Sequence, residues 1–254
     1  MKASLNYKAL KNGQPVSDAL VVEVPVQLFI EEEPLTVSMC TPTHIREWAF
    51  GILFTEGIIR SADQVTSYSE EIEDHQITIR VVLSNAANAV TNKRSLLSVS
   101  ACGICGKTAF EPPTLRDDRG ANDERSSMTL REDIAKMMVQ LREVQSLFEE
   151  TGGCHAAGVF NSEGQLIFAS EDIGRHNAVD KVVGSLVIHQ QLREAKYLMV
   201  SGRVSYEIVA KCFAAGIPNL AAVSSPSSLA VDYAKELGIS LFAFCRENRI
   251  TRYA

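Results

Sequence analysis

Two cysteines separated by two residues, Cys102 and Cys105, are the part of this sequence best suited to chemistry. Thiols at this spacing support redox exchange, half of a metal site or the carriage of sulfur. The flanking glycines and the cation of Lys107 favour exposure and a lowered thiol pKa, and the thiolate is the nucleophilic form. A thioredoxin-like pair would follow a strand and open a helix, whereas this pair precedes a polar segment. These roles, and a purely structural one, remain open at this point.

A zinc site is poorly supported by the other residues. A structural zinc ion needs about four ligands, and the nearby candidates by residue type are Cys154 and His155. A zinc-dependent deaminase needs His-x-Glu together with Pro-Cys-x-x-Cys, and neither pattern occurs. We therefore expect no structural zinc. Three further cysteines lie among apolar neighbours and are predicted to be buried packing residues: Cys40, Cys212 and Cys245.

A second group of polar residues lies where the predicted strands of the C-terminal half end. Ligands of open α/β sheets bind beyond the carboxyl ends of the strands, so the loops there form one surface. Glycines let backbone amides approach a ligand, helix N-termini favour anions, and arginines contact phosphate in a bidentate manner. The loops predict a site for a phosphate-bearing ligand, although no Walker A or GxGxxG pattern specifies which. The residues predicted for it are His155, Gly174, Arg175, His176, Ser201, Arg203, Ser205, Arg246 and Arg249.

The elements that hold these loops are predicted from hydrophobic periodicity. An amphipathic helix begins near Thr129 and includes Phe148 in its apolar stripe. An antiparallel hairpin and then strands that alternate with helices follow it, an order that predicts a parallel sheet covered by helices. The predicted strands are 156–160, 165–169, 197–200, 220–223 and 241–244.

The N-terminal half reads as a mixed sheet with one helix. Residues 21–37 and 77–83 alternate apolar with polar side chains, and residues 45–53 have helical periodicity. Residues 111–127 have no aromatic side chain and many charges and turn formers, which is typical of a flexible linker. We expect an α/β fold, α+β overall. Its predicted parts are a smaller β-rich domain over 1–110 that ends in the CxxC loop, a linker over 111–127, and an α/β cofactor-binding domain over 128–254.

Composition and charge limit the partners. With 254 residues and 46% hydrophobic residues, the chain can bury a sizeable core. Its net charge of -6 opposes sequence-independent binding to nucleic acid, which depends on many cations that neutralise phosphates. No apolar run approaches the roughly 20 residues that span a bilayer, and the first residues lack a signal peptide. Six cysteines are too few for a disulfide scaffold. We expect a cytoplasmic protein with reduced thiols and with neither nucleic-acid nor membrane partners.

Four segments resemble the FdhD family, the sulfur carriers required for formate dehydrogenase activity. Among them, EDIGRHNAVDK is highly specific, whereas a CxxC pair alone would not be. The segments are CGICGK at 102–107, TGGCHAAGVF at 151–160, EDIGRHNAVDKVVG at 171–184 and SGRVSYEIVAKCFAAGIP at 201–218.

The resemblance implies a fold similar to cytidine deaminase without its zinc, and a homodimer. It further implies that sulfur passes from a cysteine desulfurase to the molybdenum bis(molybdopterin guanine dinucleotide) cofactor of a formate dehydrogenase catalytic subunit. Cys102 would carry the sulfur as a persulfide, and Cys105 would resolve or share it. The cofactor site would include Phe244, Cys245, Arg246, Glu247, Asn248 and Arg249. The alternative is a non-catalytic cofactor chaperone or nucleotide-binding module whose cysteines are structural.

Overall fold

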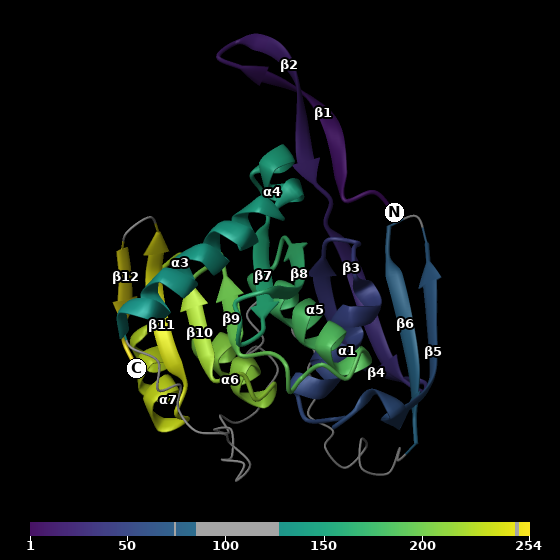
Figure 1. Ribbon diagram of the computed structural model, residues 1–254. Coiled ribbons are helices and arrows are strands. Elements are labelled where there is room, and N and C mark those ends of the chain that lie inside the picture. The colour runs from purple at the N-terminus through teal and green to yellow at the C-terminus, as the bar shows by residue number, and fades with distance from the viewer. Residues whose placement is uncertain (74, 85–126, 247–248) are drawn as a thin grey trace.

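Three β-sheets and the helices between them form the chain, shown as a computed structural model in Figure 1. The structure describes residues 1–73, 75–84, 127–246 and 249–254, with residues 127–130 by their backbone alone. The α/β class expected from the sequence is confirmed. The helices are α1 (Ile45–Thr55), η1 (Ala62–Gln64), α3 (Ser127–Glu143), α4 (Ser146–Thr151), α5 (Arg175–Ile188), α6 (Tyr206–Ala214) and α7 (Ser228–Glu236). The strands are β1 (Ser4–Lys11), β2 (Gln14–Val21), β3 (Val24–Ile30), β4 (Glu33–Cys40), β5 (Val65–Ile72), β6 (Ile77–Leu83), β7 (His155–Phe160), β8 (Leu166–Asp172), β9 (Tyr197–Val200), β10 (Asn219–Ala222), β11 (Ser240–Arg246) and β12 (Arg249–Arg252).

The six-stranded sheet has the order β12-β11-β10-β9-β7-β8. Strands β9, β10 and β11 run parallel, and β7 pairs antiparallel with both β8 and β9, so the predicted hairpin and parallel strands are confirmed. The segment from Arg246 to Arg249 was expected to be a polar loop, which is wrong in part. Arg249 begins β12, which pairs antiparallel with β11. Four residues are too few for a reliable alternation signal, so this strand depends on its neighbour.

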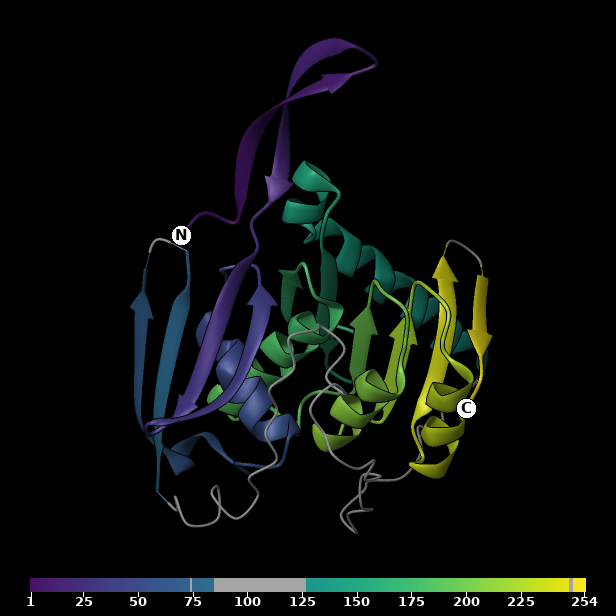
Figure 2. The same cartoon turned by 180° about the vertical axis from the view of Figure 1, so that it is seen from behind.

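Helices cover both faces of this sheet. Figure 1 shows α3 crossing one face, and Figure 2, from behind, shows α6 and α7 on the other. Side chains of the central strands therefore alternate between two cores: Leu198 and Leu220 point into one, and Tyr197 and Met199 into the other. Because both sides are buried, β9 is apolar at every position and β10 at every position after Asn219, as expected for parallel strands.

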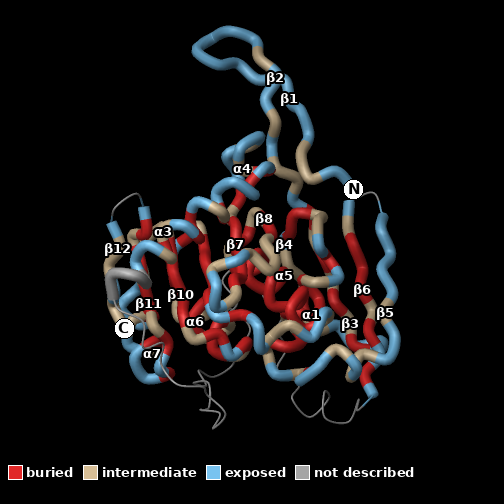
Figure 3. The backbone as a smooth tube through the Cα atoms, in the orientation of Figure 1, coloured by how far each residue is buried: buried red, intermediate tan, exposed pale blue. Residues whose placement is uncertain are grey.

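Helices α1 and α5 lie against each other and join the six-stranded sheet to a four-stranded sheet of order β4-β3-β6-β5. The buried interior in Figure 3 runs through both sheets, and one hydrophobic cluster contains residues of each. A Cβ atom at Gly51 would overlap the carbonyl oxygen of Asp180, and one at Gly184 would overlap that of Glu47. The two helix backbones can meet this closely only because both positions are glycine.

Two further features differ from the expected organisation. Residues 21–37, which read as strand throughout, are interrupted by a turn at Glu31 that separates β3 from β4. Strands β1 and β2, which the sequence did not reveal, form a two-stranded arm that projects from the body (Figures 1 and 3). The proposed linker over 111–127 lies outside the described residues except for Ser127, which begins α3, so the division into domains stays a prediction. Within the described ranges, no helix is long and apolar enough to cross a membrane.

Candidate ligand-binding site

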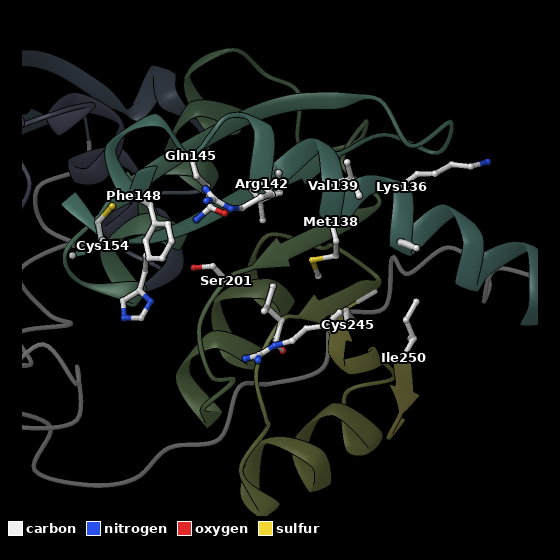
Figure 4. A pocket seen from close by; sticks show the side chains of 17 residues that line it. Lys136, Met138, Val139, Arg142, Gln145, Phe148, Cys154, Ser201, Cys245 and Ile250 are labelled. Carbon is white, nitrogen blue, oxygen red and sulfur yellow. Dashed lines mark hydrogen bonds between the residues drawn. The ribbon is translucent and has the colours of Figure 1, made fainter. Parts of the chain in front are cut away.

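A cavity of about 840 Å³ opens where α3 crosses the carboxyl ends of β9, β10 and β11 (Figure 4). Its volume falls in the usual range for sites that hold small molecules and cofactors. The segment before β7 lines it with Gly152 and Gly153, β7 with His155, and the loop after β9 with Ser201. The structure therefore places a cavity at the sheet edge where the sequence predicted a ligand.

Helix α3 and the start of α4 form the opposite wall, which the sequence analysis missed. The lining residues there are Ala135, Lys136, Met138, Val139, Leu141, Arg142, Gln145 and Phe148. The expected single helix through Phe148 is broken between Glu143 and Ser146 into α3 and α4. Val139 lies outside the apolar stripe of this helix and is 58% exposed. An apolar residue on the polar face of a predicted amphipathic helix was the sequence signal that could have revealed a binding wall.

Glu171 holds the start of α4 in place beside the cavity. Its two carboxylate oxygens accept hydrogen bonds from the amides of Leu147 and Phe148, each at 2.8 Å, which satisfies donors that a helix start leaves unpaired. The Cys154 thiol donates to the same carboxylate at 3.2 Å. Figure 4 shows Phe148 close to Cys154 at one end of the cavity. Glu171 thus fixes the backbone at Leu147 and Phe148 beside the cavity.

Three cationic or potentially cationic side chains gather around the start of β7. Burial, and then the nearby charges of Arg175 and Arg203, lower the pKa of His155. The Nε atom of Arg175 is buried without a hydrogen-bond partner among the described residues. Gly202 leaves room for this cluster, since a Cβ there would lie 3.3 Å from Nδ1 of His155 and 3.5 Å from Cβ of Arg175. The arrangement favours an anion, which would accept from the arginines and offset their charges.

Most residues of the EDIGRHNAVDK segment form hydrogen bonds beneath the cavity wall and do not line the cavity themselves. The Lys181 ammonium donates to Asp172 at 2.6 Å, and both side chains are fully buried. Asn177 donates to the other Asp172 oxygen at 3.0 Å and accepts from the Trp48 indole at 3.2 Å. The amide of Gly174, expected to face a phosphate, donates to Asp172 at 2.7 Å instead. The segment therefore fixes the loop that carries Arg175 and anchors it to the N-terminal half.

Two predicted ligand residues, His176 and Ser205, contact each other. The Nε2 atom of His176 lies 3.2 Å from the Ser205 hydroxyl and 2.9 Å from a carboxylate oxygen of Glu207. His176 is buried, and Ser205 precedes the first residue of α6. These contacts join the start of α5 to the start of α6, so His176 is a positioning residue in this structure.

The C-terminal residues of the predicted site separate into two groups. Cys245 and Arg246 line the cavity, and the Arg246 Nε donates to the carbonyl of Val223 at 3.2 Å. Phe244 has a positive φ of 54° at a bulge in β11, and the Arg249 guanidinium lies 4.7 Å from its ring centroid. Neither Phe244 nor Arg249 is among the lining residues. Glu247 and Asn248 lie outside the described residues.

The cysteines that the structure describes are all buried: Cys40, Cys154, Cys212 and Cys245. Burial raises the pKa of Cys154 to about 12, with further contributions from Glu171, and that of Cys245 to about 11. Both are therefore protonated near neutral pH and are poor nucleophiles. The packing role predicted for Cys245 agrees with its burial, although it also reaches the cavity. Cys102, Cys105 and Lys107 lie outside the described residues, so their predicted roles stay predictions.

No cluster of three or more histidine, cysteine, aspartate or glutamate side chains within the described ranges is arranged to hold a metal ion. Cys154 faces Glu171 and His155 faces the arginines, so the two nearby candidates for a zinc site have other neighbours. The expectation of no structural zinc also concerns Cys102 and Cys105, and it stays a prediction.

Fold and cavity together define an α/β protein with a cation-rimmed pocket at the carboxyl ends of its parallel strands. The chain belongs to the FdhD/NarQ family, whose family model matches residues 21–254. It is 37% identical over 270 residues to the sulfur carrier protein FdhD of Corynebacterium efficiens, which covers 99% of this chain and 94% of that protein. It is 40% identical over 243 residues to the sulfur carrier protein FdhD of Nocardia farcinica, which covers 93% of this chain and 86% of that protein. A crystal structure of a Desulfotalea psychrophila protein, assigned as a formate dehydrogenase accessory protein, matches with a TM-score of 0.73, 25% identity and coverage of 99% of this chain and 97% of that one. The family resemblance stated from the sequence is confirmed.

Proposed function

We propose that this protein is a sulfur carrier that moves sulfur, as a persulfide on Cys102, from a cysteine desulfurase to the molybdenum bis(molybdopterin guanine dinucleotide) cofactor of a formate dehydrogenase. The observation that carries the proposal is the nearly full-length similarity to proteins named sulfur carrier protein FdhD. This chain has a thiol pair at Cys102 and Cys105. The cofactor is the substrate of the transfer, and the protein acts in the cytoplasm as a homodimer.

The first step is a thiol exchange. The Cys102 thiolate attacks the outer sulfur of the donor persulfide, the donor S–S bond breaks, and the donor cysteine leaves as a thiolate. Lys107 stabilises the Cys102 thiolate before the attack. In the second step, the Cys105 thiolate attacks the Cys102 sulfur, which forms a Cys102–Cys105 disulfide and releases sulfide to the molybdenum centre. The two cysteines are oxidised as the sulfane sulfur is reduced, so the electrons balance.

Persulfide loading tests the carrier function. The protein is incubated with a cysteine desulfurase and cysteine, and its intact mass is measured. We expect a gain of about 32 Da, one sulfur atom, that cyanide removes. A protein that binds nucleotide but gains no mass and releases no sulfur to cyanide would instead be a cofactor chaperone with structural cysteines.

The cavity supports the cofactor half of the proposal. Each molybdopterin guanine dinucleotide carries a pyrophosphate. Arg175 and Arg203, which are not lining residues themselves, lie near the lining residue His155, and the buried Nε of Arg175 has no hydrogen-bond partner among the described residues, so this cluster suits such an anion. The apolar side chains of Met138, Val139 and Leu141 on α3 suit flat ring systems. His155, Ser201, Cys245 and Arg246 line the cavity, and Glu247 and Asn248 are proposed to complete the guanine contacts.

Guanosine diphosphate, a fragment of the cofactor, is expected to bind at this site more tightly than adenosine diphosphate. The substitution Arg203→Ala should weaken binding by about 1.5 to 3 kcal/mol, the scale of a charge-assisted hydrogen bond, and the loss should shrink as salt rises. Arg193→Ala is the matched control: Arg193 is exposed, lies in the turn between α5 and β9 and does not line the cavity, so its loss should leave the affinity unchanged. Calorimetry measures the affinity of the unmodified protein for each nucleotide and that of the two variants for guanosine diphosphate. Equal affinity for the two nucleotides would reject the guanine site, and an unaffected Arg203→Ala would reject the phosphate site.

A further inference from the structure

The arm of β1 and β2 leaves apolar side chains exposed to solvent. In its antiparallel register, Leu5 faces Leu20, and Tyr7 lies next along the same face of the hairpin. These side chains are 44%, 45% and 53% exposed. Exposed apolar side chains gathered on one element mark a surface that another molecule covers.

Among the described residues, contacts with the body hold the arm at its base. The Ser4 hydroxyl donates to Glu150 at 2.8 Å. The amide of Val22 donates to the carbonyl of Ala3 at 2.8 Å, which joins the two strands of the arm to each other at its base. Val21 packs beside Gly153. The rest of β1 is exposed from Leu5 to Lys11. A two-stranded hairpin is marginally stable on its own in water, so this length of ordered hairpin needs further packing.

Strand β5 has properties that complement β1. It is the outer strand of the four-stranded sheet, and among the described residues neither β1 nor β5 pairs along its second edge. Both strands are eight residues long. β1 carries Lys8 and Lys11, whereas β5 carries Glu70 and Glu71. Ile72, at the end of β5, is itself 53% exposed, so it can meet the apolar side chains of the arm.

We propose that β1 of one copy of this chain adds to the free edge of β5 in a second copy. Main-chain hydrogen bonds join the two edges. Lys8 and Lys11 lie on opposite faces of β1, and Glu70 and Glu71 lie on opposite faces of β5, so each face brings one lysine near one glutamate, directly opposite or on the diagonal. The base of the arm and the end of β5 lie at the same end of the molecule in both views of Figures 1 and 2. A two-fold axis can therefore bring each arm to the other copy's β5, which makes a closed dimer. This contact would be the interface of the homodimer included in the proposed function.

A charge exchange tests this pairing through the molar mass in solution, measured by sedimentation equilibrium. The unmodified chain should have about twice its monomer mass of 27.8 kDa. The arm variant Lys8→Glu/Lys11→Glu and the strand variant Glu70→Lys/Glu71→Lys should each weaken the dimer by about tenfold or more, because opposed pairs become like-charge pairs. Combining all four substitutions in one chain should restore the dimer. The control Arg193→Glu/Lys235→Glu makes the same change in net charge as the arm variant, at exposed sites elsewhere, and should leave the mass unchanged.

Three results would overturn the pairing. They are a monomeric unmodified chain, an arm variant that dimerises as tightly as the unmodified chain, and a four-residue exchange that fails to restore the dimer although circular dichroism shows it folded. The last two separate this interface from a dimer formed elsewhere. Persulfide loading is measured independently on the same proteins, so failure of the interface and failure of the sulfur-carrier function give different results.

Discussion

The Cys102→Ala protein is expected to gain no sulfur after incubation with a cysteine desulfurase and cysteine. The reason is chemical: the attacking atom of the proposed transfer is the Cys102 sulfur, and the four described cysteines are buried. Two of those, Cys154 and Cys245, have pKa values raised to about 12 and about 11, so they cannot replace a thiolate near neutral pH. Intact mass distinguishes the loaded protein, heavier by about 32 Da, from the unloaded one.

A buried cysteine supplies the control for this experiment. Cys212 is fully buried and donates to the carbonyl of Ile217 at 3.3 Å. Cys212→Ala should therefore retain the mass gain. Guanosine diphosphate binding and the unfolding curve of Cys102→Ala should match the parent protein if the loss is chemical. A Cys102→Ala protein that still loads sulfur would contradict the assignment, and loss in Cys105→Ala alone would exchange the roles of the two cysteines.

Asp172→Ala should lower the free energy of unfolding by about 3 to 5 kcal/mol, because it leaves the Lys181 ammonium buried without its counter-ion. Asp172 also accepts from the amides of Thr41 at 3.0 Å and Gly174 at 2.7 Å, and both donors would be left unsatisfied. Urea unfolding followed by circular dichroism measures the change. The His155 cluster should also loosen, since Asp172 holds the loop that carries Arg175.

The exposed ion pair of Arg142 and Glu149 is the matched comparison for the buried one. Its side chains are 51% and 73% exposed, so Glu149→Ala should cost no more than about 1 kcal/mol. The double variant Asp172→Ala/Lys181→Met removes both buried charges and should recover part of the loss. If the double variant is no more stable than Asp172→Ala, the unpaired ammonium is not the source of the destabilisation.

The sequence alone determined the order and class of the C-terminal elements and the sheet edge at which polar loops meet. Apolar runs, turn residues and helix starts are local signals, and the rule that ligands bind beyond strand ends converts them into one surface. His155, Ser201 and Arg246 were placed at this edge from chain order, and the structure brings them to one cavity. The family was also identified from the sequence alone, because the motif EDIGRHNAVDK is highly specific to it.

Only the tertiary structure decided what most residues of that motif do. Asp172, Asn177 and Lys181 bind partners near residue 40 and at Trp48, more than 120 positions away in the sequence, so no local pattern reports their buried network. The same holds for the cavity wall of α3, because a helix pattern shows which face is apolar but not which neighbour covers it. The arm of β1 and β2 is a third case. Most side chains of β1 and β2 are exposed within one chain. Strands are recognised in a sequence by the alternation of apolar and polar residues that a half-buried sheet requires, so these two strands lack the pattern.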